Sequence, residues 1–497
     1  MREATKENEL YPELEAALTQ GKLDGTMLKK AFSAYADLHF PSVPIPEASG
    51  RLTAIFCEGM IDRTQLNDHF YGLCQFALVS AGLADEGDGG PEELPIVEHG
   101  QSIEQMLDAL FTGKLILFAE GEARFWIVFI SNIPQRQPEE SNTEISIKGP
   151  RDAFTEEMCT NIGLIRKRMR TSMLFSEQFE IGTMSKTRVT LLYLKNKADE
   201  TIVKEARKRL STLEAESILS SGQLEQWIAD RTYSLLPLLD YIGRPDFVVE
   251  TLLRGRLAII VDGSPMALIG PVNFLELLKS PEDVHHPYYY VMTQRLLRLL
   301  GLLLSIFLPG FWIAMASVNP DQIPFSLVST VVISREGVPL PLFLETFLLL
   351  FLFELLREAG VRMPKAVGQT IGIVGGLIIG DSLIRAGLAS PTLLVVIAIA
   401  AVATFSLVNQ SLSGSVSLFR AVILLVSAFL GIYGFMLCLF ACIIYICQLS
   451  SFGVPYVDPI VSFRYREWLD ALLMNPFKRR RVKPMKMDRK MPQKGDS

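Results

Sequence analysis

The sequence predicts a soluble, cytosolic α/β region of two small subdomains, followed by a polytopic α-helical transmembrane domain. Three observations support this fold class. Residues 1–291 are polar and charged, whereas residues 292–450 consist mainly of Leu, Ile, Val, Phe and Gly. Strand-like and helix-like patterns alternate along the first part, as they do in α/β proteins. The second part contains apolar runs of the ~20 residues that a membrane crossing requires.

Residues 1–48 are expected to form one or two short helices and a linker broken by prolines. The first α/β subdomain follows at 49–145. In it, Ser102 and Gln105 have the spacing of a capping box, which predicts a helix to Leu110. The other elements expected there are a strand at Leu52–Cys57, a helix at Asp62–Ala81, and strands at Leu115–Ala119 and Phe125–Ile130.

The second α/β subdomain is expected at 146–240. It should begin with a helix that follows Gly149–Asp152 and ends near Leu174, and continue with a strand at Val189–Leu194 and a helix at Glu200–Glu216. The first helix has a basic cluster, which suits contact with an acidic surface or anionic lipid. A solvated helix face, or pairing with nearby glutamates, explains the cluster equally simply. Its members are Arg166, Lys167, Arg168 and Arg170.

Residues 241–291 are predicted to form a neck between the soluble and membrane parts. Apolar runs at Leu257–Val261 and Met266–Ile269 flank a turn at Asp262 and Gly263, which predicts a β-hairpin. Helical spacing precedes the hairpin, and tyrosines suited to a bilayer interface follow it at 288–290. We expect this neck to couple events in water to events in lipid. The candidate coupling residues are Arg244, Asp246, Asp262 and Gly263.

The transmembrane helical domain is expected at 292–450, with a basic cytoplasmic tail at 451–497. The tail has a dense group of lysines and arginines, and such groups stay on the cytoplasmic side. The N-terminus has no apolar signal segment, so both termini are expected inside and the number of crossings is expected to be even. Candidate spans are 296–317, 339–358, 366–388, 391–410 and 416–447. The second is either a span or an interfacial piece.

The segment 368–382 is the most pore-like part of the chain. Glycines at every fourth position give one helix face a smooth stripe, which usually serves helix packing. Polar residues within the segment, and bulky apolar ones that would gate by dewetting, also suit a pore lining. Asp381 and Arg385 are four residues apart and would neutralise each other. The pore and gate candidates are Gln369, Thr370, Ile373, Val374, Leu377 and Asp381.

A second group of charges lies around the end of the 339–358 run. Charges within a membrane region usually face water, protein or each other. Ordinary salt bridges at the membrane surface explain this group, and a ring of charge at a pore mouth is the functional alternative. The pore-mouth candidates are Glu354, Arg357, Glu358 and Arg362. Arg420, near the start of the last span, is expected to extend its charge towards the membrane surface.

Composition argues against several other functions. The net charge of −6 argues against a nucleic-acid partner. The six cysteines form no CxxC pair and lack accompanying histidines, so we expect no metal site and no cofactor. The soluble part has no phosphate-binding loop, dinucleotide motif or HExxH sequence, and we therefore expect no enzyme.

Several long motifs resemble one family. They are RPD at 244–246, LLRGRLAIIVDGSPMALIGP at 252–271, SPED at 280–283, REGVPLP at 335–341, ELLREAGVRMPKAVGQTIGIVGGLIIG at 354–380 and SSFGVPY at 450–456. The chain resembles the A subunits of the GerA-type spore germinant receptors over roughly residues 50 to 460. It departs from that family at Gly243, where Glu usually precedes Arg-Pro-Asp.

This resemblance implies a nutrient-responsive receptor in the inner membrane of a bacterial spore. It implies two partner subunits: a transporter-like B subunit that binds the nutrient, and a lipoprotein C subunit. It also implies a homo-oligomer, as a pentamer, around a ligand-gated cation channel that triggers germination. The residues alone leave a second function open, a non-conducting membrane scaffold or signalling subunit of the receptor complex.

Overall fold

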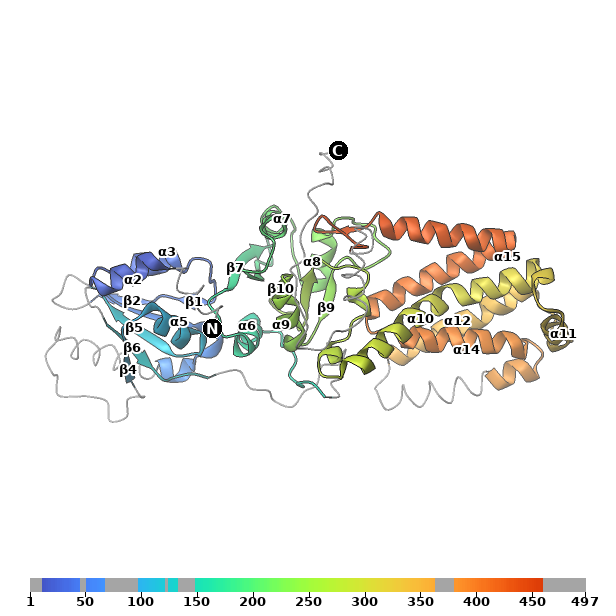
Figure 1. The fold of residues 1–497 in the computed structure, drawn as a ribbon, viewed down its shortest axis with the longest axis horizontal. Helices are drawn as coiled ribbons and strands as arrows, with labels where there is room; N and C mark the ends of the chain where they lie inside the picture. The colour runs from blue at the N-terminus through green and yellow to red at the C-terminus, as the bar shows by residue number, and fades with distance from the viewer. Residues whose placement is uncertain are drawn as a thin grey trace.

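The computed structural model describes residues 11–44, 51–67, 97–120, 124–132, 148–362 and 380–458. Two α/β units lie at one end of an elongated molecule, and a bundle of long helices lies at the other (Figure 1). The α/β units come first along the chain and the helices follow, except that a short hairpin after the last helix returns to the α/β units. In that hairpin Ser451 Oγ donates a 2.7 Å hydrogen bond to Leu238 O, which returns the chain to the junction between the two halves.

The first unit is an antiparallel sheet with strand order β1-β3-β5-β6-β4, and β2 also pairs with β3. Residues of β5 are buried on both faces of this sheet. Helices α2, α3 and α5 contribute to the core on one face. The bounds are α2 Pro12–Thr19, α3 Gly25–Ala31, β1 Leu38–His39, β2 Ser42–Pro44, β3 Arg51–Cys57, β4 Val97–Gly100, α5 Ile103–Phe111, β5 Leu115–Ala119 and β6 Phe125–Val128, with a 3-10 turn at Glu58–Met60.

The sequence-based elements of this unit are confirmed where the structure describes them. Ser102 Oγ accepts a 3.2 Å hydrogen bond from Gln105 N at the start of α5, as the capping box predicts. Of the helix expected at 62–81, only the part up to residue 67 is described. The one or two short helices expected within residues 1–48 are confirmed as α2 and α3, and the described residues 11–44 also supply strands β1 and β2 to this unit.

The second unit is an antiparallel sheet with strand order β7-β8-β10-β11-β9. Helices α7 and α8 cover one face of this sheet, while α6 and α9 cover the other. The bounds are α6 Met158–Arg168, β7 Leu174–Ile181, β8 Thr187–Leu194, α7 Glu200–Ser211, α8 Ser221–Ile228, β9 Asp240–Ile242, α9 Pro245–Leu253, β10 Leu257–Val261 and β11 Ala267–Gly270. The predicted hairpin is confirmed as β10 and β11, but it lies inside this sheet rather than in a separate neck.

The helix expected to run from about 151 to Leu174 is wrong at both ends. The helix in this stretch is α6 alone. After it the chain forms strand β7, which pairs with β8 over its whole length. The basic cluster at its end was also interpreted wrongly for Arg166. That side chain is fully buried, and Arg166 Nη2 donates a 2.8 Å hydrogen bond to Asp37 Oδ1. The pair joins the first unit to the second, so Arg166 is not part of a solvated face.

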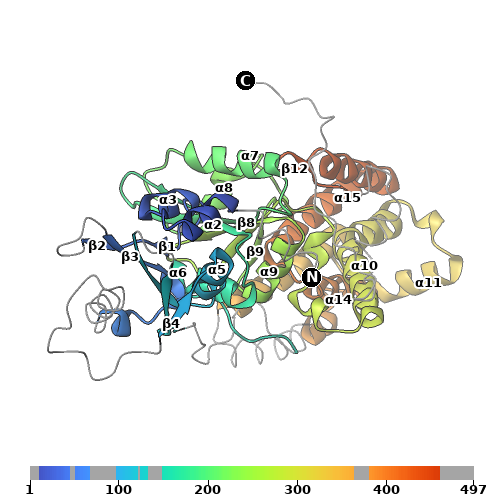
Figure 2. The same ribbon diagram turned by 60° about the vertical axis from the view of Figure 1, so that its left-hand side comes forward.

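The helical half begins with two 3-10 turns, Glu276–Leu278 and Pro281–Val284, which precede the first long helix. Its helices are α10 Tyr288–Ile313, α11 Phe325–Ser334, α12 Leu342–Arg362, α14 Pro391–Phe405 and α15 Gln410–Cys447. Helix α10 continues as a π-helical turn, Ala314–Val318, and a 3-10 turn, Pro320–Gln322, follows. Helix α11 lies at the end of the bundle remote from the α/β units (Figures 1 and 2). The short strands β12 Ser450–Ser451 and β13 Val454–Pro455 end the described chain.

Helix α15 is two antiparallel segments rather than one long span. Gly431 has φ +61° and ψ −141°, a backbone conformation that only glycine adopts readily. Beyond it the chain reverses, and the rings of Phe419 and Tyr445 lie 5.9 Å apart between centroids. In one straight helix, residues that far apart in sequence would be separated by about 39 Å at 1.5 Å per residue. The expectation of a single long span at 416–447 is therefore wrong, because Gly431 folds it in half.

The other spans have mixed outcomes. Among the described residues, two helical stretches are long and apolar enough to cross a membrane, Tyr288–Val318 and Ser411–Cys447. The run expected at 339–358 lies largely in one continuous helix, α12, and its position as a span or an interfacial piece stays a prediction. Helix α14 is shorter than the span expected at 391–410. Most of the span expected at 366–388 lies outside the described residues.

The helical half differs from a soluble domain in its exposed apolar surface and in the charges that it buries. Charged side chains lie inside: Glu345, Arg420 and Arg295 are all buried. Large apolar side chains cover the outside of the same helices, for example Phe429 and Val402. Soluble proteins rarely expose apolar patches of this extent. An apolar exterior, with a few charges buried in a mainly apolar interior, is the arrangement that lipid favours.

Candidate coupling site between the soluble and helical halves

The turn of the β10–β11 hairpin is tied to the start of α6. Asp262 Oδ1 accepts a 3.2 Å hydrogen bond from Met158 N, and Asp262 Oδ2 lies 2.9 Å from Arg188 Nη2. Gly263 has φ +80°, and its amide donates a 2.8 Å hydrogen bond to Glu156 O. The predicted turn is thus confirmed, and its residues fix the hairpin to the helix beside it.

Arg244 is the centre of a second group of charges. Its guanidinium is buried and lies 2.7 Å from Asp246 Oδ2 and 2.5 Å from Glu282 Oε1. His285 Nε2 lies 3.1 Å from the same Asp246 oxygen. Burial alone would raise the pKa of Asp246, but the hydrogen bonds and charge of Arg244, together with the contact to His285, outweigh burial and lower it. The group joins the start of α9 to the 3-10 turn that precedes α10.

A third group surrounds the buried carboxylate of Glu276. Arg254 and Arg256 place guanidinium nitrogens 3.2 Å and 3.1 Å from its Oε2 atom, and Lys279 pairs with Oε1. Burial opposes ionisation, but the three cations hold the pKa of Glu276 well below its usual range. Burial, together with Arg254, lowers the pKa of Lys279 to about 7. The motif LLRGRL therefore contributes two of the cations that neutralise one buried acid.

Asp283 connects the neck directly to α10. Its Oδ2 atom lies 2.8 Å from Arg295 Nε, and its Oδ1 atom lies 3.0 Å from Arg298 Nη2. Arg298 also donates a 2.9 Å hydrogen bond to Leu278 O. All three charged side chains are buried. Burial makes such contacts sensitive to displacement, because separating them leaves charges without partners in a poorly solvated place.

Asp240 connects the soluble sheet to the last helix. Asn409 Nδ2 donates a 2.7 Å hydrogen bond to Asp240 Oδ1, while Asn409 Oδ1 accepts from Leu412 N at 3.1 Å and caps α15. Burial raises the pKa of Asp240 to about 7. A cavity of about 500 Å³ opens beside this contact, lined by apolar side chains and by polar ones that include Glu225, Tyr241 and Lys279.

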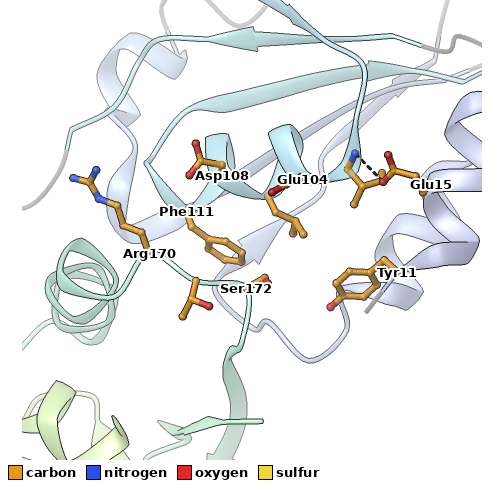
Figure 3. A pocket seen from close by; sticks show the side chains of 10 residues that line it. Tyr11, Glu15, Glu104, Asp108, Phe111, Arg170 and Ser172 are labelled. Carbon is orange, nitrogen blue, oxygen red and sulfur yellow. Dashed lines mark hydrogen bonds between the residues drawn. The ribbon is translucent and has the colours of Figure 1, made fainter. Parts of the chain in front are cut away.

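The joint between the two α/β units holds a smaller cavity of about 140 Å³ (Figure 3). Helix α2, helix α5 and the loop after α6 each contribute side chains to it. Glu15 Oε2 there accepts a 3.3 Å hydrogen bond from Ile103 N. Nearby, Tyr35 donates to Ser172 O, which adds a further contact across the joint. These contacts and the Asp37–Arg166 pair hold the two units together.

The pore-mouth candidates Glu354 and Arg357 pair with each other within one chain. Glu354 Oε2 also lies 3.5 Å from Arg420 Nη2, and Arg357 Nη1 donates a 2.8 Å hydrogen bond to Ser413 Oγ. Arg420 is buried and also bonds Thr404, so the expectation that it extends to the membrane surface is wrong. A role for Glu354, Arg357, Glu358 and Arg362 at a pore mouth stays a prediction.

Of the gate candidates, only Asp381 is described. Its Oδ2 atom lies 2.7 Å from Arg385 Nε, and both side chains are largely exposed, which confirms the expected pairing. Gln369, Thr370, Ile373, Val374 and Leu377 lie outside the described residues.

Sequence reasoning identified Arg244, Asp246, Asp262 and Gly263 but missed most of the junction. The missed residues are Asp240, Arg254, Arg256, Glu276, Lys279, Asp283, Arg295, Arg298 and Asn409. A signal existed for some of them, since charges at 254, 256, 276 and 279 interrupt otherwise apolar sequence. The pairing of Asp240 with Asn409 joins distant parts of the chain and has no local signal.

A soluble α/β half joined through buried ion pairs to an apolar-coated helical half defines a membrane-associated protein. The chain belongs to the Bacillus/Clostridium GerA spore germination protein family, which it matches over residues 26–486.

Individual relatives match most of this chain. It is 40% identical over 439 residues to spore germination protein XA of Bacillus anthracis, covering 87% of this chain and 89% of that protein. It is 32% identical to spore germination protein KA of Bacillus subtilis (strain 168), and the match covers 90% of this chain and 83% of that protein. A crystal structure of the N-terminal domain of the A subunit of the Bacillus megaterium spore germinant receptor GerK3 is 29% identical, with a TM-score of 0.35, covering 50% of this chain and 93% of that one.

Proposed function

We propose that this chain is the A-type subunit of a nutrient-responsive spore germinant receptor, and that it oligomerises into a ligand-gated cation channel in the spore inner membrane. Membership of the spore germination family supports the receptor role. The observation that carries the membrane role is the apolar exterior of the helical half, which encloses buried charges such as Glu345 and Arg420.

A pore between several copies fits the interior of the bundle better than a pore through one copy. Between α10 and the two segments of α15 lies a cavity of only about 60 Å³, lined by apolar side chains such as Leu302, Phe307 and Val416. Such a space does not provide the polar groups that replace water around an ion. We therefore place the conducting path at an axis shared by copies, with segment 368–382 as its lining.

The buried groups at the junction supply the coupling that a gated channel needs. Asp283 bonds α10, and Asp240 bonds the cap of α15, so both helices are attached to the second α/β unit. A displacement of that unit would pull on two helices at once. In this function a transporter-like B subunit binds the nutrient, a lipoprotein C subunit completes the complex, and both termini of this chain are cytoplasmic. No catalytic step is required.

The test is cation flux from vesicles that contain the complete receptor complex. Nutrient should start potassium release, and complexes carrying Asp283→Asn should bind nutrient while releasing potassium much more slowly. If complexes with intact nutrient binding and full content of this chain release no potassium, the chain is the non-conducting scaffold instead.

A further inference from the structure

Apolar side chains are exposed in one short part of the soluble half. Tyr233 is 96% exposed and Trp227 is 57% exposed, and Leu219 and Leu235 are exposed as well. Elsewhere in the described soluble residues before Tyr288, the exposed large apolar side chains are a few scattered ones such as Met184. We call Leu219, Trp227, Tyr233 and Leu235 the apolar patch. Scattered exposed residues are ordinary, but a cluster of them marks a contact surface.

The loop that follows α8 and carries Tyr233 and Leu235 is held in place from both sides. Asp230 Oδ1 lies 2.6 Å from Arg209 Nη1 on α7. The same carboxylate accepts hydrogen bonds from Ser450 Oγ at 2.6 Å, Phe452 N at 2.9 Å and Gly453 N at 3.0 Å, all in the hairpin after α15. The loop is therefore fixed relative to the end of the last helix.

The patch lies beside the ends of α10 and α15 where their uncharged, apolar stretches begin. Leu235 N donates a 2.7 Å hydrogen bond to the Tyr445 hydroxyl in the last turns of α15. The next residue, Leu236, lines an apolar cavity together with Leu302 of α10. Leu302 follows the last buried arginine of α10, Arg298, and begins its uncharged part. A bilayer around the helices would therefore have its surface beside Leu235.

The chemistry of the patch suits a lipid surface. Tyr and Trp prefer the interface of a bilayer, where the ring contacts apolar chains and the polar atom stays hydrated. The exposed Arg231 lies beside Tyr233 and suits anionic lipid phosphates, whereas the neighbouring Asp230 is occupied by Arg209 and the hairpin.

We propose that the apolar patch, with Arg231, inserts into the headgroup layer of the cytoplasmic leaflet and is a second membrane contact of the soluble half beside α10. This contact rests on the proposed membrane location of the helical half but not on the channel. It holds the second α/β unit at a fixed height, so that nutrient signals displace the unit along the membrane surface rather than away from it.

The test uses the full chain, with Cys447 replaced by serine, in vesicles of phosphatidylglycerol and phosphatidylethanolamine. Spin labels are attached at Tyr233→Cys, or at Trp227→Cys if the first variant folds poorly. A matched label at Met184→Cys reports the water environment, because this side chain is highly exposed on the soluble half. A second label at Phe429→Cys reports the lipid environment, because this side chain is highly exposed on α15. Collision with oxygen and with a water-soluble nickel complex is measured at each position.

The expected ratio of oxygen to nickel collisions at position 233 is several-fold above that at 184 and below that at 429. If the oxygen-to-nickel ratio at positions 233 and 227 equals that at 184, the lipid contact is overturned. A lipid-like ratio at 429 in the same experiment would still support the membrane location of the helical half. A water-like value at 429 would instead overturn the membrane location itself. Immobile labels at 233 that broaden one another between copies would overturn the lipid contact in favour of a protein interface.

Discussion

The carboxylate of Asp283 lies 2.8 Å from Arg295 Nε, and this buried pair joins the soluble half to the first long helix. The same carboxylate also holds Arg298. One acid thus neutralises two cations of α10, at the point where that helix leaves the neck. Removing its charge would take this carboxylate away from both buried guanidiniums.

We predict that Asp283→Asn lowers the free energy of unfolding by about 3–5 kcal/mol, the usual cost of removing one partner of a buried ion pair. Unfolding of the full chain in detergent, followed with denaturant, measures the change. Asp321→Asn is the matched control, because Asp321 is exposed at the remote end of the bundle. Its effect should stay within about 0.5 kcal/mol. Equal stability of the two variants would contradict the role of Asp283.

Gly431 makes the reversal inside α15, and we predict that Gly431→Ala disrupts it. A Cβ there would lie 2.2 Å from Asn319 Oδ1, which accepts a 3.0 Å hydrogen bond from Ile432 N. The positive φ adds backbone strain. Gly414→Ala is the control, since its Cβ meets nothing within 4 Å in the same helix and should raise stability by up to about 1 kcal/mol. Similar yields and unfolding midpoints for both variants would refute the reversal.

Gly263 tests the hairpin turn separately from packing. A Cβ there has nothing within 4 Å, so the cost of substitution comes from its φ of +80° alone. We predict that Gly263→Val costs about 1–3 kcal/mol and impairs nutrient-triggered germination while membrane insertion persists. Gly263→Asn should be close to wild type, because Asn tolerates positive φ. Normal germination of spores carrying the valine variant would show that the turn does not couple the two halves.

The raised pKa of Asp240 predicts that the free energy of unfolding depends on pH. Burial raises its pKa to about 7, with Arg256 opposing and Glu276 adding to the rise. The folded chain therefore binds this proton more tightly than the unfolded chain does. Its contribution to stability is present at low pH and declines as pH rises from 3.8 towards about 7. Asp240→Asn keeps an acceptor for the Asn409 amide, so the stability difference between variant and wild type should grow over this range. A constant difference would contradict the prediction.

Local patterns in the sequence were enough to predict the hairpin and strands β3, β5, β6 and β8, because the Asp262–Gly263 turn and the apolar runs act over a few residues. They failed where distant residues decide the structure. Arg166 looked like a solvated cation because its partner, Asp37, lies in another unit. The span at 416–447 looked continuous because Gly431 resembles the packing glycines around it, and its φ depends on contact with Asn319. Arg420 was misplaced because Glu354 comes from another helix.

The channel itself is tested most directly by potassium efflux from spores after nutrient addition. Cysteines are placed singly from Gly368 to Ser382, and a thiol reagent is added once efflux begins. A pore lined by this segment predicts block at positions with helical periodicity that include Ile373, Val374 or Leu377, and no block at a lipid-facing control, Phe429→Cys. Unchanged efflux at every position that still germinates would contradict a pore built from this segment.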